Sequence, residues 1–142
     1  MKRLYLLCVA GALAVPCAYV YAQEFPGAPP NLKGIEAKGL PRLSTEELKA
    51  LFPDVVNFKG STGKHKMTFK SDGSVVMTTY KQDMTGKWRI DEKNNAYCMA
   101  FNFKKGYDEY CFAVFRASDG THYFDYDIKN GFYARTWRRS TE

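Results

Sequence analysis

Short runs of β-branched and aromatic residues, separated by turn residues, follow one another from Pro53 to the end of the chain. The turn residues recur at intervals of about 8–12 residues, a spacing typical of an antiparallel all-β domain. The pattern therefore predicts eight short strands, over residues 55–59, 64–70, 74–80, 85–90, 96–103, 107–116, 121–128 and 132–137.

Polar and apolar positions alternate within several of these strands. Between residues 64 and 70, His65, Met67 and Phe69 share one face, and the other face carries lysine and threonine. Because successive side chains of a strand point to opposite faces, such a strand has one buried face and one solvated face. Seven or eight strands of this kind predict a mainly all-β fold, an antiparallel meander that forms a small barrel or a curled sheet.

One short helix is expected before the strands. Ser44 and Glu47 have the spacing of a capping box, and Pro53 ends the helix, which places it at residues 45–52. Residues 23–43 contain four prolines and three glycines and show no helical or strand period. They predict an extended lead-in, and the helix is expected to plug or cover one end of the barrel.

The first 22 residues have the pattern of a secretory signal peptide. Lys2 and Arg3 precede an apolar stretch, and Val20-Tyr21-Ala22 offers small residues at the two positions that a signal peptidase reads. Two alternatives stay open, an uncleaved anchor and a lipoprotein modified at Cys17, although the proline before Cys17 suits lipoprotein processing poorly. The predicted organisation is a signal peptide over 1–22, the lead-in over 23–43 and a single β-barrel-like domain over 44–142.

Export of the chain changes its composition. Removing 22 of the 142 residues, Lys2 and Arg3 among them, leaves 120 residues and lowers the net charge from +6 to +4. We expect a mature protein in the periplasm or outside the cell, with no transmembrane segment and no affinity for nucleic acid. Nearly all the aromatic side chains remain, so the aromatic excess belongs to the mature domain.

The cysteines predict one disulfide. Cys8 and Cys17 belong to the signal peptide, which leaves Cys98 and Cys111 as a pair in an oxidising compartment. A hairpin that turns at Lys104-Lys105 places these two residues directly opposite each other, at a separation that a disulfide can bridge. The alternative is a pair of buried free thiols. A disulfide here would have a structural role.

Catalytic and metal-binding motifs are poorly represented. The chain has no Gly-x-Ser-x-Gly elbow, and the glycine-rich residues 60–64 have the wrong spacing for a phosphate-binding loop. His65 and His122 lie in different strands without metal-ligand spacing, so no metal and no cofactor is expected. Asp125 and Asp127 share a strand face, about 7 Å apart, and could act as the paired carboxylates of a hydrolase, although such a pair is more often a solvated edge.

The aromatic surplus is the clearest functional signal. The rings are too many for one face of a small sheet, so some of them line a cavity or form an exposed patch, unless they simply fill the core. A second signal is the cluster of Arg135, Arg138 and Arg139 around Trp137, which could bind an anionic group or form a solvated basic face. The candidate ligand- or partner-binding residues are Trp88, Tyr97, Phe101, Tyr110, Tyr123, Tyr126, Arg135 and Trp137.

Six short motifs follow one another along the chain: Leu51-Phe52-Pro53, Ser71-Asp72-Gly73-Ser74, Gly86-Lys87-Trp88, Tyr97-Cys98, Tyr110-Cys111 and Asp119-Gly120. In this order the chain resembles, over about residues 44–137, a family of small exported bacterial proteins that are described as lipocalin-like and whose function is not characterised. The resemblance implies a periplasmic or secreted β-rich protein. It supplies no catalytic residue, because its motifs are turns, a strand tryptophan and two cysteines.

The leading functional prediction is a non-enzymatic, exported binding protein of the bacterial envelope, which takes a small apolar or aromatic ligand or an envelope partner. One alternative is an inhibitor or immunity-type protein that binds another exported protein. The other is a hydrolase that uses Asp125, Asp127 and His122. A sealed apolar cavity would favour the ligand-binding function, and a flat exposed patch would favour a protein partner. A cleft that joins His122 to both aspartates would favour the hydrolase.

Overall fold

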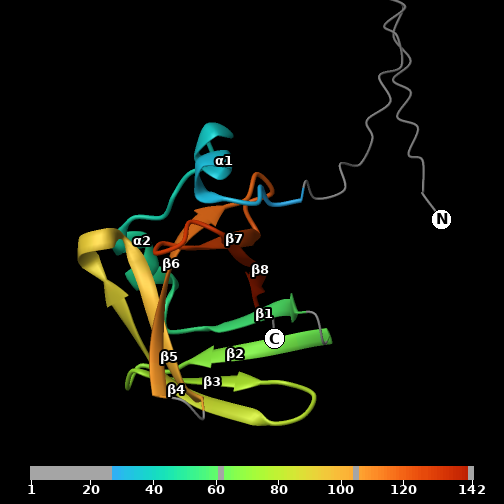
Figure 1. The fold of residues 1–142 in the computed structure, drawn as a ribbon, viewed down its shortest axis with the longest axis vertical. Helices are drawn as coiled ribbons and strands as arrows, with labels where there is room; N and C mark the ends of the chain where they lie inside the picture. Colours follow the sequence, from blue (N-terminus) through green and yellow to red (C-terminus); the bar gives the residue numbers. More distant parts are fainter. Residues whose placement is uncertain (1–26, 61–62, 104–105, 141–142) are drawn as a thin grey trace, which may run out of the picture.

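The protein is a closed eight-stranded antiparallel β-barrel with two short α-helices, seen in a computed structural model that describes residues 27–60, 63–103 and 106–140 (Figure 1). The strands pair in sequence order, and the last returns to pair with the first. The all-β prediction is confirmed. The helices are α1 (Leu32–Ala37) and α2 (Thr45–Leu51), and the strands are β1 (Val55–Gly60), β2 (Gly63–Phe69), β3 (Ser74–Thr78), β4 (Asp83–Asp91), β5 (Ala96–Phe103), β6 (Gly106–Arg116), β7 (His122–Asp127) and β8 (Tyr133–Arg139).

The signal peptide that the sequence predicts over residues 1–22 lies outside the described residues. Within the described ranges, no helix is both long enough and apolar enough to cross a membrane.

Strands β5 and β6 form the long hairpin that the sequence predicts. The pairing runs from Tyr97 opposite Phe112 to Phe103 opposite Gly106, and it places Cys98 opposite Cys111. The two sulfur atoms are bonded, so the predicted register and disulfide are both confirmed. The connecting residues 104–105 lie outside the described part of the chain.

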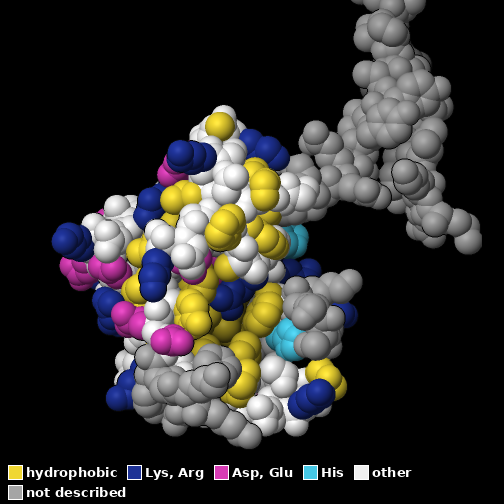
Figure 2. Space-filling view, viewed as in Figure 1, with side chains coloured by type: hydrophobic (Ala, Val, Ile, Leu, Met, Phe, Trp, Pro, Cys, Tyr) yellow, Lys and Arg dark blue, Asp and Glu magenta, His cyan; other side chains and the backbone are white. Residues whose placement is uncertain are grey.

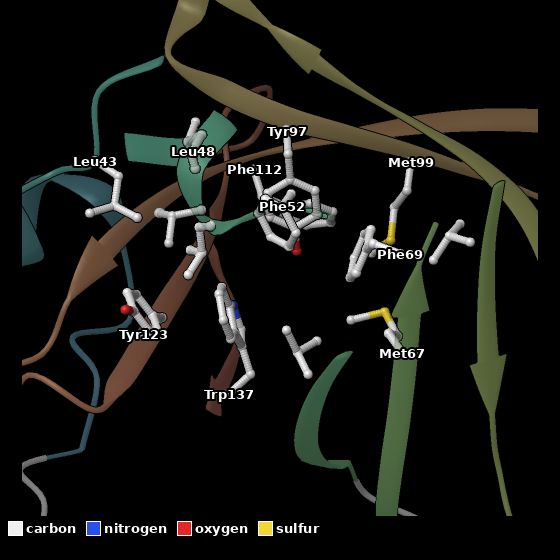
Figure 3. Packing of buried hydrophobic residues seen from close by; sticks show 14 of the residues in the cluster. Leu43, Leu48, Phe52, Met67, Phe69, Tyr97, Met99, Phe112, Tyr123 and Trp137 are labelled. Atoms are coloured by element: carbon white, nitrogen blue, oxygen red, sulfur yellow. The ribbon is translucent and has the colours of Figure 1, made fainter. Parts of the chain in front are cut away.

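The barrel interior is filled by the alternating apolar residues of the strands, as expected from the period of two. Met67 and Phe69 of β2 are buried there, and Phe52 enters from the C-terminal end of α2 (Figure 3). The ring of Phe52 lies 4.7 Å from that of Phe69 and 4.9 Å from that of Tyr97, measured between centroids. Helix α2 therefore closes one end of the barrel, as predicted.

Helix α2 is held in place at its N-terminal end. Ser44 and Glu47 form the predicted capping box, and Glu47 also pairs with Arg116 on β6 at 3.1 Å. The hydroxyl of Thr45 donates a hydrogen bond of 2.8 Å to the side chain of Asn95, in the turn between β4 and β5. The closed end of the barrel is therefore the end at which β4 finishes and β5 begins.

Helix α1 corrects the prediction that residues 23–43 are extended throughout. The side chain of Asn31 accepts a hydrogen bond of 2.9 Å from the backbone of Gly34 and begins the helix. Ile35 is fully buried against the outer face of the sheet, where Phe115 and Tyr126 form part of a second apolar cluster. A helix this short depends on tertiary burial rather than on its own periodicity, which is why the sequence pattern did not show it.

Candidate functional site

A hollow of about 420 Å³ opens at the end of the barrel opposite α2, a volume within the usual range of small-molecule sites. On the face seen in Figure 2, hydrophobic side chains gather in a central hollow, with a lysine or arginine side chain among them and a histidine at the edge. The hollow is apolar but open rather than sealed. Its lining residues are Met77, Met99, Phe101, Tyr110, Phe112, Asp127, Asn130, Phe132, Tyr133, Ala134 and Arg135.

A buried carboxylate lies beneath this cavity. Asp125 is 0% exposed and accepts hydrogen bonds from the Tyr97 hydroxyl at 2.5 Å and from the Trp137 indole nitrogen at 2.7 Å. Arg135 Nε lies 3.2 Å from Asp125 Oδ2. Burial raises the pKa of Asp125, while Arg135, Trp137 and Tyr97 act in the opposite direction. Each of these partners is a hydrogen-bond donor, so the surroundings of Asp125 favour a carboxylate at this position.

The Arg135 side chain extends from β8 across the barrel interior. Its guanidinium carbon lies 4.6 Å from the ring centroid of Phe112 on β6 and 5.5 Å from that of Phe58 on β1. Nη1 lies 3.6 Å from the sulfur of Met67. Contacts from three different strands hold the cation at the base of the cavity, where its side chain keeps 15% exposure.

The predicted site residues separate into three groups. Tyr97, Arg135 and Trp137 meet at Asp125, and the ring of Tyr123 stacks on that of Trp137 at 4.5 Å between centroids. Four predicted residues, spread over the 40 positions from Tyr97 to Trp137, therefore form one cluster, which the topology brings together.

Phe101 and Tyr110, also predicted, line the cavity wall, and Tyr110 is 45% exposed at its edge. Room for the Phe101 ring comes from Gly86, where a Cβ atom would lie 2.8 Å from that ring and 2.3 Å from the Ala100 carbonyl oxygen.

Two predicted residues lie elsewhere. Trp88 packs against Phe52 and Phe69 in the core and donates a hydrogen bond of 2.8 Å to the carbonyl of Lys70. Tyr126 points to the outside of the barrel, where its hydroxyl donates to the carbonyl of Pro29 at 2.8 Å. Tyr126 is fully buried and Trp88 is half-buried, and both side chains have structural contacts.

Asp125 and Asp127 occupy different environments. Asp127 accepts hydrogen bonds from the backbone of Lys129 and Asn130 in the β7–β8 turn, whereas Asp125 is enclosed in the barrel. A register shift between Asp125 and Tyr126 interrupts the regular pairing of β7 with β8 at this point. The hydrolase alternative stays a prediction.

The two histidines line a second hollow of about 510 Å³, formed by β1, β2, β8 and the start of β7, which shares Tyr133 with the first. His122 Nδ1 lies 2.6 Å from Asp119 Oδ2. Among the described residues, one group has the spacing of metal ligands, Asp91 with Cys98 and Cys111. Its cysteines are joined in the disulfide, so neither offers a thiolate to a metal.

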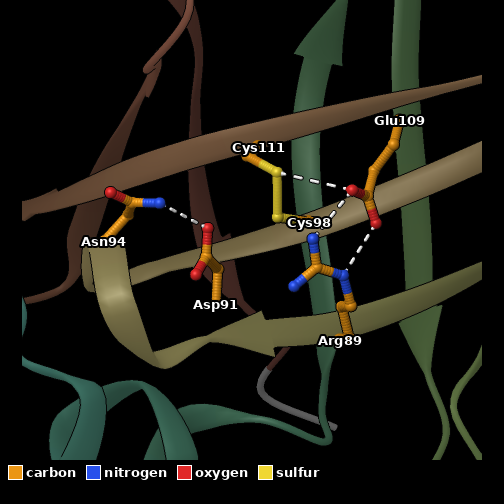
Figure 4. A network of polar contacts seen from close by, with 6 residues as sticks. All are labelled: Arg89, Asp91, Asn94, Cys98, Glu109 and Cys111. Atoms are coloured by element: carbon orange, nitrogen blue, oxygen red, sulfur yellow. Dashed lines mark hydrogen bonds and ion pairs between the residues drawn. A yellow bond between two sulfur atoms is a disulfide. The ribbon is translucent and has the colours of Figure 1, made fainter.

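The outer face beside the disulfide carries a network of charged groups (Figure 4). Arg89 forms two hydrogen bonds of 2.8 Å with Glu109, and the hydrogen bond from Arg89 lowers the pKa of Glu109. Asn94 donates to Asp91 at 2.8 Å. A hollow of about 670 Å³ adjoins this network, but two of its charged lining groups, Arg89 and Glu109, already pair with each other. The interior cavity is therefore the better candidate site.

The predicted binding residues include Phe101, Tyr110 and Arg135 but not the rest of the cavity lining, to which Met77, Met99 and Asp127 belong. Met99 shares a strand face with Tyr97 and Phe101, so its alternation was a usable signal. The alternation of β3 offered a weaker one for Met77. Asp127 joins the cavity through the closing turn between β7 and β8, which no local pattern indicates.

No protein-family model matches the chain, and no curated protein or solved structure is significantly similar to it. The functional argument therefore depends on the geometry of the cavity.

Proposed function

We propose that this chain is an exported, non-enzymatic binding protein that holds a small apolar or aromatic ligand at the open end of its barrel. The cavity of about 420 Å³ carries the proposal, because it combines apolar and aromatic walls with few polar groups. That combination is the usual composition of a small-molecule site. The residues assigned to binding are Phe101, Tyr110, Phe112 and Arg135.

The edge of the cavity supports the same function. Phe132 is 65% exposed and Tyr133 is 38% exposed beside the opening. Large exposed rings are costly in water unless a ligand or partner covers them, so they are suited to closing over a bound molecule. These rings belong to the β7–β8 turn and the start of β8, which also contribute to the cavity wall.

Export belongs to the proposal as well. The signal-peptide pattern and the disulfide both favour the periplasm or the exterior of the cell, where disulfides persist. Membership of the lipocalin-like exported family is proposed from the six sequence motifs.

Binding of N-phenyl-1-naphthylamine, an apolar fluorescent probe, tests this function. We expect saturable fluorescence enhancement with the wild-type chain, and at least a tenfold weaker affinity for Ala134→Trp, because a new indole at the cavity edge narrows the opening. Ala50→Trp is the matched control, since Ala50 is exposed on α2 at the closed end. Equal loss in both variants, or no saturable binding by the wild type, would contradict the proposal.

A further inference from the structure

The cavity contains one positively charged group whose donors are only partly used. The hydrogen bonds and ion pairs among the described residues occupy Nε and Nη1 of Arg135, and Nη2 takes part in none of them. Arg135 lines the cavity and retains 15% side-chain exposure. A guanidinium has no accepting atom, so the group that it can bind in the cavity is a hydrogen-bond acceptor.

The charges around Arg135 decide which kind of acceptor fits. Asp125 is fully buried against the guanidinium and balances its positive charge. A second carboxylate, Asp127, lines the same cavity. A ligand carboxylate would therefore enter a site whose formal charges, summed over these three groups, are already negative. Like charges at an apolar site repel, whereas a neutral carbonyl keeps the hydrogen bond without that repulsion.

The side chains of the cavity walls indicate the chemistry of the rest of the ligand. Phe101, Phe112 and Met99 present flat or flexible apolar surface, and the guanidinium is held between the rings of Phe112 and Phe58. A ring-bearing molecule can stack on these side chains while its polar end reaches Arg135. Two polar side chains at the edge of the cavity already have hydrogen-bond partners. Asn130 donates to Asp127, and the hydroxyl of Tyr133 bonds to Thr136.

We infer that the ligand is an apolar, ring-bearing molecule whose polar end is an uncharged oxygen acceptor, such as a ketone or ester carbonyl, received by Arg135. This inference rests on the proposed function and names the class of ligand that the same cavity takes. It assigns Arg135 the recognition of the polar end and the aromatic walls the recognition of the ring.

Three naphthalenes of similar size test this, with affinities measured by equilibrium dialysis at pH 7. The probes are 2-acetylnaphthalene, which has a neutral carbonyl, 2-naphthoate, which has a carboxylate, and 2-ethylnaphthalene, which has no acceptor. We expect 2-acetylnaphthalene to bind about tenfold more tightly than 2-ethylnaphthalene, the usual effect of a hydrogen bond to a charged donor. We expect 2-naphthoate to bind more weakly than 2-acetylnaphthalene.

A double variant attributes the preference to Arg135. Arg135→Met alone would leave Asp125 buried without its counter-charge and could unfold the barrel, so Asp125→Asn is combined with it. We expect the double variant to bind 2-acetylnaphthalene and 2-ethylnaphthalene with nearly equal affinity, so that the tenfold preference is lost. Lys66→Met, which removes an exposed cation from the outer face of β2, is the control and should keep the preference.

The outcomes separate the inference from the proposed function. Binding of all three probes with equal affinity, tighter binding of 2-naphthoate, or an unchanged preference in the double variant would overturn the inference and leave the apolar site standing. If the folded wild-type chain binds none of the three probes, the proposed function fails, and the ligand class fails with it. Circular dichroism establishes that each variant is folded.

Discussion

Asp125 shows how a charged residue is accommodated inside this barrel. An isolated carboxylate in an apolar interior is strongly destabilising, but here the Tyr97 hydroxyl, the Trp137 indole and the Arg135 guanidinium surround it. Burial, together with the neighbouring Asp125 charge, raises the pKa of Tyr97 well above its ordinary value. The hydroxyl therefore stays protonated at neutral pH and can donate its hydrogen bond.

Replacing Tyr97 by Phe tests this network at a single atom. We expect Tyr97→Phe to lower the free energy of unfolding by about 1–3 kcal/mol, because it leaves a buried carboxylate with one donor fewer. Tyr133→Phe removes a hydroxyl that bonds to Thr136 near the surface, and should change stability by less than about 0.5 kcal/mol. Urea unfolding followed by circular dichroism measures both. A Tyr97→Phe protein as stable as the wild type would show that Asp125 does not depend on this donor.

The β5–β6 hairpin is the element in which local sequence and tertiary pairing agree most closely. Alternation of large and small side chains along β5 selects its inward face, and the pairing places Cys98 opposite Cys111 on the other face. Beyond the disulfide, Leu43 donates a backbone hydrogen bond of 2.8 Å to Val114, which joins the lead-in to β6. The hairpin thus links the barrel to the segments that cover it.

Removing the disulfide tests its contribution to this element. Replacing Cys98 and Cys111 together by Ala should lower the free energy of unfolding by about 3 kcal/mol, the chain-entropy value for closing a loop of this length. The reduced wild-type protein is the control and should unfold at nearly the same urea concentration as the double variant. If oxidised and reduced wild type unfold together, the bond has no stabilising role.

The β6–β7 turn predicts a pH dependence. Burial alone would raise the pKa of Asp119, but hydrogen bonds from the backbone and side chains of His122 and Thr121 outweigh it and lower the pKa to about 2. A carboxyl group whose pKa is lower in the folded state stabilises the fold above its unfolded pKa, near 4. This stabilisation disappears as the pH falls from about 4 to about 2.

Asp119→Asn should therefore unfold at a lower urea concentration than the wild type at pH 7, and the difference should shrink as the pH approaches 2. Asp83→Asn, at an exposed position of β4, serves as the matched control and should change the midpoint little. Urea titrations at several pH values give the comparison. A difference between Asp119→Asn and the wild type that is the same at pH 7 and pH 2 would exclude the Asp119 charge as its source.

At the scale of the whole molecule, two apolar clusters lie on opposite sides of one sheet. The interior cluster fills the barrel under α2, and the second lies between α1 and the outer face of β6 and β7. Figure 1 shows α1 near β7 and well apart from strands β1 to β4. Because both faces of β7 are covered, four consecutive residues of this strand, from Tyr123 to Tyr126, are buried.

Ile35 tests whether the outer cluster belongs to the cooperative fold. We expect Ile35→Ala to lower the free energy of unfolding by about 2–4 kcal/mol, because the side chain is 0% exposed and the lost contacts leave a cavity. Lys33→Ala, on the exposed face of the same helix, should change it by less than about 0.5 kcal/mol. Urea unfolding measures both variants. Equal stability of Ile35→Ala and the wild type would mean that the packing of α1 on the barrel does not contribute to the free energy of unfolding.

Local patterns predicted most strands within a few residues, but not every element or the whole site. β4 begins two residues earlier than expected, at Asp83, and β8 continues to Arg139, where it pairs with Val56. Such extensions depend on a neighbouring strand that offers hydrogen bonds, which a local window does not contain. Likewise, Trp88 and Tyr126 are aromatic, as binding residues often are, yet each makes packing and hydrogen-bond contacts that only the fold defines.

The sequence by itself determined the strand order, the inward faces, the α2 cap and the Cys98–Cys111 register, because each depends on periodicity or on turn and cap chemistry within a short stretch. Closure of the barrel was left open, between a barrel and a curled sheet, and only the pairing of β8 with β1 decided it. The tertiary structure alone placed Asp125 with Tyr97, Arg135 and Trp137, and Asp127 at the cavity. These residues meet through long-range strand pairing, so the chemistry of the candidate site follows from the closed topology.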